Sequence, residues 1–139
     1  MDKLDGKDPC CIDVSDRLAG AVWGHLVGDA MGVPYEFGPP VLPEEVQWGH
    51  RATYRPQPPG TWSDDGGLML SLLDSLLEVG FDSEDQGRRA LDWWLGDAYK
   101  PGPLFDVGLI TRESLERIRN GTEPELAGAT GEDENGTDR

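Results

Sequence analysis

Proline is concentrated in one stretch of this chain, and its position limits the fold more than any other feature. Residues 33–60 contain seven of the eleven prolines. Proline fixes φ and lacks a backbone N–H, so this stretch cannot form a long helix or a central strand. Loops of such length are usually binding loops, lids or disordered segments. Because aromatic residues such as Tyr35, Phe37, Trp48 and Tyr54 are rare in disordered linkers, we interpret this loop as the rim of a binding site.

The first segment with helical periodicity covers residues 15–32, where glycine recurs at every fourth position. Ser15 or Asp13 can cap its start. Each glycine costs up to about 1 kcal/mol of helix propensity relative to alanine, so a repeated set indicates close approach of another backbone. The four glycines of this face are Gly20, Gly24, Gly28 and Gly32.

Three further helices are expected after the proline-rich loop, and no convincing strand is found. Ser83 and Gln86 form a predicted capping box for a helix that reaches Gly96, and its Trp93 and Trp94 are expected to pack in the core and at its rim. The last helix is expected over residues 111–119. The first of the three helices, directly after the loop, carries a leucine face that we expect in the core. It is made of Leu68, Leu72, Leu73, Leu76 and Leu77.

Charge and length restrict the class of protein. The 139 residues are enough for about one domain, which we place at residues 15–121, between a flexible arm (1–14) and an acidic, disordered tail (122–139). With 12 basic and 27 acidic residues the net charge is −15, which opposes binding to nucleic acid. Neither a signal peptide nor a membrane span is found, and the neighbouring Cys10 and Cys11 are expected to be free thiols, so a cytoplasmic location is expected.

Chemistry is concentrated at Ser63, Asp64 and Asp65, which precede the leucine-rich helix. Three hard oxygen donors in a row suit Mg²⁺, Ca²⁺ or Mn²⁺. The alternative is a helix N-cap, because Ser and Asp side chains accept hydrogen bonds from the free N–H groups there. Asp29 is expected either to serve as a structural hydrogen-bond acceptor or to belong to the site, and we assign it no catalytic role.

Four sequence blocks together resemble the ADP-ribosylglycohydrolase family, which includes the dinitrogenase reductase-activating glycohydrolases. The resemblance extends over about residues 15–135. It implies an all-α fold, an orthogonal helical bundle, and hydrolysis of the glycosidic bond between ADP-ribose and a protein side chain at a two-Mg²⁺ centre, where Mn²⁺ is also possible. The blocks are RLAGAVWG (17–24), GDAMGVPYEF (28–37), TWSDD (61–65) and FDVG (105–108).

The resemblance also implies roles for individual residues. Glu36 corresponds to the acidic residue that the family places over the substrate ribose, as a gate or catalytic aid. Asp106 and Gly108 are expected near the substrate. The first half of the metal ligands corresponds to Ser63, Asp64 and Asp65.

Two departures from the family pattern bear on activity. Gly66 and Gly67 follow the Asp pair where the family often has Thr. The family's second Asp-x-Asp-Asp ligand cluster, further along a longer chain, is absent. We therefore expect a domain that is incomplete at its C-terminus and that acts with a complementing chain or through self-association. The alternatives are a non-catalytic ADP-ribose-binding pseudoenzyme and a truncated helical interaction fragment.

Overall fold

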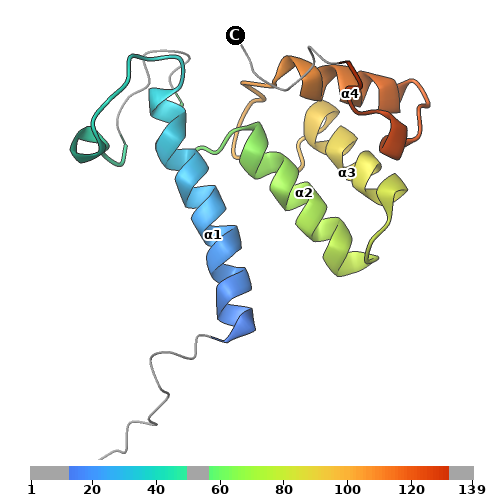
Figure 1. Ribbon diagram of the computed structural model, residues 1–139, viewed down its shortest axis with the longest axis horizontal. Helices are drawn as coiled ribbons and strands as arrows, with labels where there is room; N and C mark the ends of the chain where they lie inside the picture. The colour runs from blue at the N-terminus through green and yellow to red at the C-terminus, as the bar shows by residue number, and fades with distance from the viewer. Residues whose placement is uncertain (1–12, 50–56, 132–139) are drawn as a thin grey trace, which may run out of the picture.

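The computed structural model describes residues 13–49 and 57–131, and all regular structure in these ranges is helical, which confirms the predicted all-α class. Figure 1 shows the arrangement. The helices are α1 (Val14–Gly32), α2 (Asp64–Glu78), α3 (Ser83–Leu95) and α4 (Leu109–Arg119), with the short 3₁₀ helices η1 (Val33–Tyr35), η2 (Pro43–Glu45) and η3 (Pro124–Leu126).

Some predictions fall outside these ranges. They concern Cys10, Cys11 and Tyr54, most of the N-terminal arm, and residues 132–139 of the tail. Within the described ranges, no helix is both long and apolar enough to cross a membrane.

The four long helices pack unevenly. α2 lies along α3, and α4 and η3 lie against α3. α1 stands to one side: it meets α2 near the start of α2, and from there the two helices diverge (Figure 1). The backbone carbonyl of Asp13 accepts from Arg17 at 3.0 Å at the start of α1, but the Asp13 side chain makes no capping hydrogen bond. The arrangement therefore has a compact α2–α3–α4 part and a loosely attached first helix.

α2 contacts α3 through small residues, and the prediction of a leucine core on α2 is wrong for the described residues. Leu72 and Leu76 are 44% and 43% exposed, and Leu77 is 77% exposed. The reason is the bulk of Trp93, which is 1% exposed and lies where a side chain on residue 67 would be. Only a face without large side chains lets α3 come this close, and that face consists of Gly67, Ser71 and Ser75.

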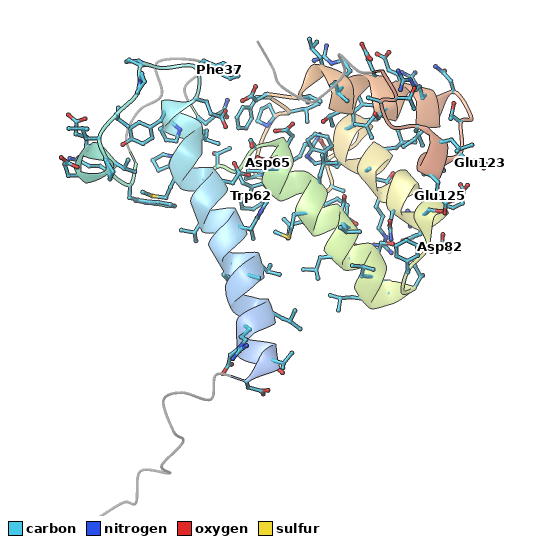
Figure 2. The ribbon with its side chains drawn as sticks, in the orientation of Figure 1. Phe37, Trp62, Asp65, Asp82, Glu123 and Glu125 are labelled. Carbon is cyan, nitrogen blue, oxygen red and sulfur yellow. The ribbon has the colours of Figure 1, made fainter. Side chains whose placement is uncertain are left out.

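The start of α3 is capped by Asp82, so the predicted capping box of Ser83 and Gln86 is not formed. An Asp82 carboxylate oxygen accepts from the Asp85 N–H at 3.1 Å. Ser83 is the first helical residue, and its hydroxyl instead donates to Glu125 at 2.9 Å. Figure 2 shows Glu125 beside Asp82 at this end of α3.

η3 packs on α3 within the stretch that the sequence assigns to the tail. A Cβ on Gly87 would come 2.6 Å from Pro124, so the two backbones meet at a glycine. Ala127, just after η3, is 1% exposed. The start of the predicted tail is therefore ordered against α3, because Pro124 and Ala127 provide apolar surface for it. The domain boundaries as a whole stay predictions.

The glycine face of α1 has no neighbour among the residues that the structure describes. A Cβ added at Gly20, Gly24, Gly28 or Gly32 would meet nothing within 4 Å. The predicted close approach of a second backbone is therefore not made within this part of the chain.

Candidate functional site

Asp29 joins α1 to the start of α2. Its carboxylate accepts from the Ser63 N–H at 3.0 Å, the Ser63 hydroxyl at 2.8 Å and the Gly66 N–H at 2.8 Å. These N–H groups belong to the first turn of α2, where four amides lack partners within the helix and negative charge is favoured. The cap is thus supplied by another helix. Ser63 occupies the N-cap position, but its side chain donates to Asp29 and accepts no capping hydrogen bond.

Glu36 lies close to carboxylates from two other segments. The pKa of Glu36 is raised from 4.5 to about 8. Burial is the largest cause, followed by the hydrogen bond with the Asp106 carboxyl and the negative charges of Asp106, Asp29 and Asp64. The end of α1, the start of α2 and the loop before α4 therefore meet here. The neighbours that act on Glu36 are all carboxylates, so like charges accumulate at one place.

Asp64 is held by the loop before α4. The Gly108 N–H donates to an Asp64 carboxylate oxygen at 3.3 Å, which favours the charged form. Burial nevertheless raises the pKa of Asp64, and the charges of Asp65 and Asp106 act in the same direction. The predicted residues Asp64, Asp106 and Gly108 thus lie together.

Strained backbone lies on two sides of this cluster. Phe37, next to Glu36, has φ of 56°, and Asp106 has φ of 51°. Both values fall in the left-handed region, which is uncommon for residues other than glycine and often occurs at functional sites. At Asp106 this conformation accompanies the hydrogen bond to Glu36.

A hollow of about 430 Å³ opens beside the carboxylates, between α1 and the start of α2. The glycines on the α1 side leave this space free because they have no side chains. Figure 2 shows Asp65 and Trp62 where the start of α2 meets α1. The hollow is lined by Gly24, His25, Gly28, Asp29, Gly32, Glu36 and Asp65.

A network of hydrogen bonds and ion pairs holds the segment that leads into α2. Trp62 Nε1 donates to the Tyr99 carbonyl at 3.0 Å, and the Tyr99 hydroxyl donates to Asp74 at 2.5 Å. Arg89 on α3 forms ion pairs with both Asp74 and Asp85. These contacts tie the loop after α3 to α2, and so position the residues that follow Trp62.

Gly66 and Gly67 are required by their neighbours. A Cβ on Gly66 would lie 2.7 Å from the Asp29 carboxylate and 2.8 Å from Trp62. A Cβ on Gly67 would overlap the Trp93 indole. A side chain at either position would therefore have to displace its neighbours around the start of α2.

The donor types fit a hard cation such as Mg²⁺. Asp64, Asp65 and Glu36 offer carboxylate oxygens. Burial raises the pKa of Glu36 and Asp64, and the neighbouring negative charges, which raise it in the same direction, are what a divalent cation would neutralise. Among the described residues, however, no three His, Cys, Asp or Glu side chains are arranged to hold a metal ion. The donor types therefore suit such an ion, but the described side chains are not arranged as a coordination shell.

The sequence predicts Asp29 as a structural hydrogen-bond acceptor, which the structure confirms, but it predicts neither the partners of Asp29 at the start of α2 nor the position of His25 in the hollow. Two features of the sequence could have indicated the role of Asp29. It lies near the end of the first helix, and Gly66, whose N–H donates to it, has no side chain to block the contact. His25 lies four residues before Asp29, which places it on the same side of α1.

Fold and site together define an all-helical protein in which carboxylates from three segments converge beside an open hollow. Residues 11–137 match the ADP-ribosylglycohydrolase family, and the chain belongs to it. The resemblance seen in the sequence is thereby confirmed.

Several curated proteins are similar. The ADP-ribosylarginine hydrolase Tri1 of Serratia proteamaculans (strain 568) is 34% identical over 86% of this chain and 36% of its own length. The protein of that name from Pseudomonas putida (strain GB-1) is 32% identical over 73% of this chain and 28% of its own. The uncharacterized protein YegU of Escherichia coli (strain K12) is 32% identical over 77% and 35%. The chain thus spans about a third of the length of these relatives. No solved structure matches it.

Proposed function

We propose that this chain provides the Glu36, Asp64 and Asp65 side of a hydrolase that releases ADP-ribose from modified protein side chains. The observation that carries the proposal is the meeting of Glu36 with Asp64 and Asp106 beside an open hollow, in a member of this family. Two relatives are named ADP-ribosylarginine hydrolases, which supports ADP-ribosylated arginine as the substrate. A cytoplasmic location belongs to the same proposal.

Each residue of the site has a defined task in this scheme. Asp64 and Asp65 would hold Mg²⁺, which when bound orients ribose hydroxyls and the attacking water and stabilises negative charge. Glu36, with its raised pKa, can hold a proton near neutral pH and transfer it at the glycosidic bond. Asp106 orients Glu36 through their hydrogen bond, and Asp29 fixes Ser63 at the start of α2.

Binding of Mg²⁺ is the first test. Calorimetric titration of the purified chain is expected to show Mg²⁺ binding that Asp64→Asn plus Asp65→Asn abolishes. The matched control is Asp13→Asn plus Asp16→Asn, which removes the same charge at the far end of α1 and should leave binding intact. Equal loss in both double variants would show that net charge alone attracts the ion, and would contradict the assignment.

Hydrolysis itself is tested on a protein carrying ADP-ribosylated arginine, by measuring released ADP-ribose with and without Mg²⁺. A second candidate is a non-catalytic ADP-ribose binder, which would need only the open hollow beside the carboxylates and no metal ion. Binding of ADP-ribose without any release, under conditions where a full-length relative is active, would support this second function.

A further inference from the structure

The loop between α3 and α4, residues 96–108, meets the start of α2 at two places. At its end, the Gly108 N–H donates to Asp64 at 3.3 Å. Near its beginning, the Tyr99 carbonyl accepts from Trp62 Nε1 at 3.0 Å, and Trp62 lies two residues before Asp64. We call this segment the α3–α4 loop, and Figure 1 shows it passing beside the start of α2.

Tyr99 has a backbone conformation that needs support from its surroundings. Its φ of 58° lies in the left-handed region, which is uncommon for residues other than glycine and persists where neighbouring groups hold it in place. In this conformation the Tyr99 carbonyl reaches the Trp62 indole. Relaxation of Tyr99 to a negative φ would turn the carbonyl in another direction, so the hydrogen bond depends on what holds Tyr99.

The hydroxyl of Tyr99 is held by two helices. It donates to an Asp74 carboxylate oxygen on α2 at 2.5 Å and accepts from Arg89 on α3 at 3.2 Å. The Arg89 side chain is only 12% exposed and forms ion pairs with Asp74 and Asp85. Burial and the hydrogen bond to Asp74 raise the pKa of Tyr99, so the hydroxyl keeps its proton and stays a donor. None of these four residues lines the hollow beside the carboxylates.

The α3–α4 loop has little freedom to absorb a shift at Tyr99. Its two prolines fix φ at their own positions and restrict the residues before them. The loop also follows Trp62 for much of its length, across a narrow crevice. The loop residues that line this crevice are Lys100, Pro101, Pro103, Leu104 and Phe105. A change at Tyr99 is therefore passed along the loop toward Gly108.

We propose that Tyr99 is a positioning residue for the carboxylate site. Its hydroxyl, held between Asp74 and Arg89, sets the α3–α4 loop, which contacts Trp62 near its beginning and Asp64 at its end. The consequence for hydrolysis rests on the proposed function. The positioning itself does not, because these contacts form without substrate or metal.

Tyr99→Phe tests the proposal, because it removes the hydroxyl and keeps the ring. In proton–nitrogen NMR spectra we expect the Trp62 indole signal to shift. The Trp62 indole N–H and the Gly108 amide should exchange with solvent at least tenfold faster, while the amide of Leu115, which is buried in α4, keeps its wild-type rate. Unchanged rates at Trp62 and Gly108 would overturn the proposal. Equal acceleration at Leu115 would also overturn it, since that result means general destabilisation.

Two substitutions of Asp74 separate the hydroxyl contact from the ion pair. Asp74→Asn keeps an oxygen that accepts from Tyr99 but removes the charge that pairs with Arg89, so both exchange rates should stay near those of the wild type. Asp74→Leu removes the acceptor at similar size and should behave like Tyr99→Phe. The control is Arg88→Gln, which breaks exposed ion pairs on the same α3 and should change neither rate. Equal rates in the two Asp74 variants would refute the role of the hydroxyl.

The hydrolysis assay separates this proposal from the proposed function. Tyr99→Phe should lower kcat at least tenfold, because small misplacements of reacting groups slow catalysis strongly. An unchanged kcat in an active chain would show that the α3–α4 loop does not position the reacting groups, and would overturn the proposal. No release of ADP-ribose by the wild type, with the exchange rates as expected, would contradict the hydrolase function and leave the positioning by Tyr99 supported.

Discussion

Asp29 is the residue on which the geometry of the site depends most, because it closes three hydrogen bonds to the first turn of α2. Asp29→Ala leaves the Ser63 and Gly66 amides without their acceptor, and we expect the free energy of unfolding to fall by about 1–3 kcal/mol. Urea denaturation followed by circular dichroism measures this. Asp16→Ala, an exposed change in the same helix, is the control, and an equal loss in both variants would show that Asp29 does not cap α2.

Glu36 makes stability depend on pH. Between 4.5 and about 8 the folded chain binds more protons than the unfolded chain, so the free energy of unfolding falls as pH rises. Glu36→Gln removes this dependence. We expect the variant to match the wild type at low pH and to exceed it above pH 8, by on the order of 1 kcal/mol once solvent screening of the half-buried carboxyl is allowed for.

The measurement is a series of urea denaturations across this pH range without divalent ions. Glu44→Gln, in the exposed part of the same loop, is the matched control and should give a difference from the wild type that does not grow with pH. A Glu36→Gln curve parallel to the wild type would mean that the Glu36 carboxyl titrates as an ordinary exposed group.

Glu36, Ser63, Asp64 and Asp65 could be selected as candidate site residues because each lies in a short block whose residue order is distinctive. For Asp29 the expected role of hydrogen-bond acceptor is confirmed, but the segment that it meets could not be predicted. An Asp near a helix end is ordinary, and only the packed structure shows that its carboxylate meets the amides of a segment 34 residues later. Contacts between distant segments carry no local signature in the sequence.

At the scale of elements, periodicity predicted where the helices form but not which face they bury. The leucine face of α2 looks like core by hydrophobicity, whereas α3 packs against Gly67, Ser71 and Ser75. The determining fact is the size of Trp93, which needs an opposing helix without side-chain bulk. Hydrophobicity alone does not report this steric requirement.

Alanine scanning of glycines tests the packing of α2 on α3. In Gly67→Ala the new methyl group meets the buried Trp93 indole, and overpacking of this kind costs about 1–3 kcal/mol of stability. In Gly24→Ala the methyl group meets nothing, and the gain in helix propensity stabilises the chain by up to about 1 kcal/mol. Urea denaturation should therefore give changes of opposite sign, and changes of the same sign would contradict the role assigned to Trp93.

Docking of η3 depends on the glycine at which it meets α3. In Gly87→Ala the Cβ would approach Pro124 to 2.6 Å, so we expect η3 to move away from α3 and Ala127 to become accessible. Limited proteolysis should then cut after residue 121 several times faster than in the wild type. Gly128→Ala, in open space, is the control, and equal cleavage rates would show that η3 adapts without leaving α3.

For the whole molecule, two electrostatic effects compete. A net charge of −15 opposes compaction, and dissolved salt relieves it because the screening length falls to about 3 Å at 1 M. Salt also weakens ion pairs such as those of Arg88 with Asp85 and Asp92, but exposed pairs contribute only about 0–1 kcal/mol each. The repulsion acts over the whole chain, so we expect relief of repulsion to win.

Raising NaCl from about 0.02 M to about 0.5 M should therefore increase the free energy of unfolding, by on the order of 1 kcal/mol. Urea is the denaturant for this experiment because guanidinium is itself a salt. KCl at the same ionic strength should have the same effect, since screening depends on ion charge and concentration and not on which monovalent cation is used. A fall in stability with salt would mean that the ion pairs of Arg88 and Arg89 outweigh the repulsion, and would make them the dominant electrostatic feature of the described residues.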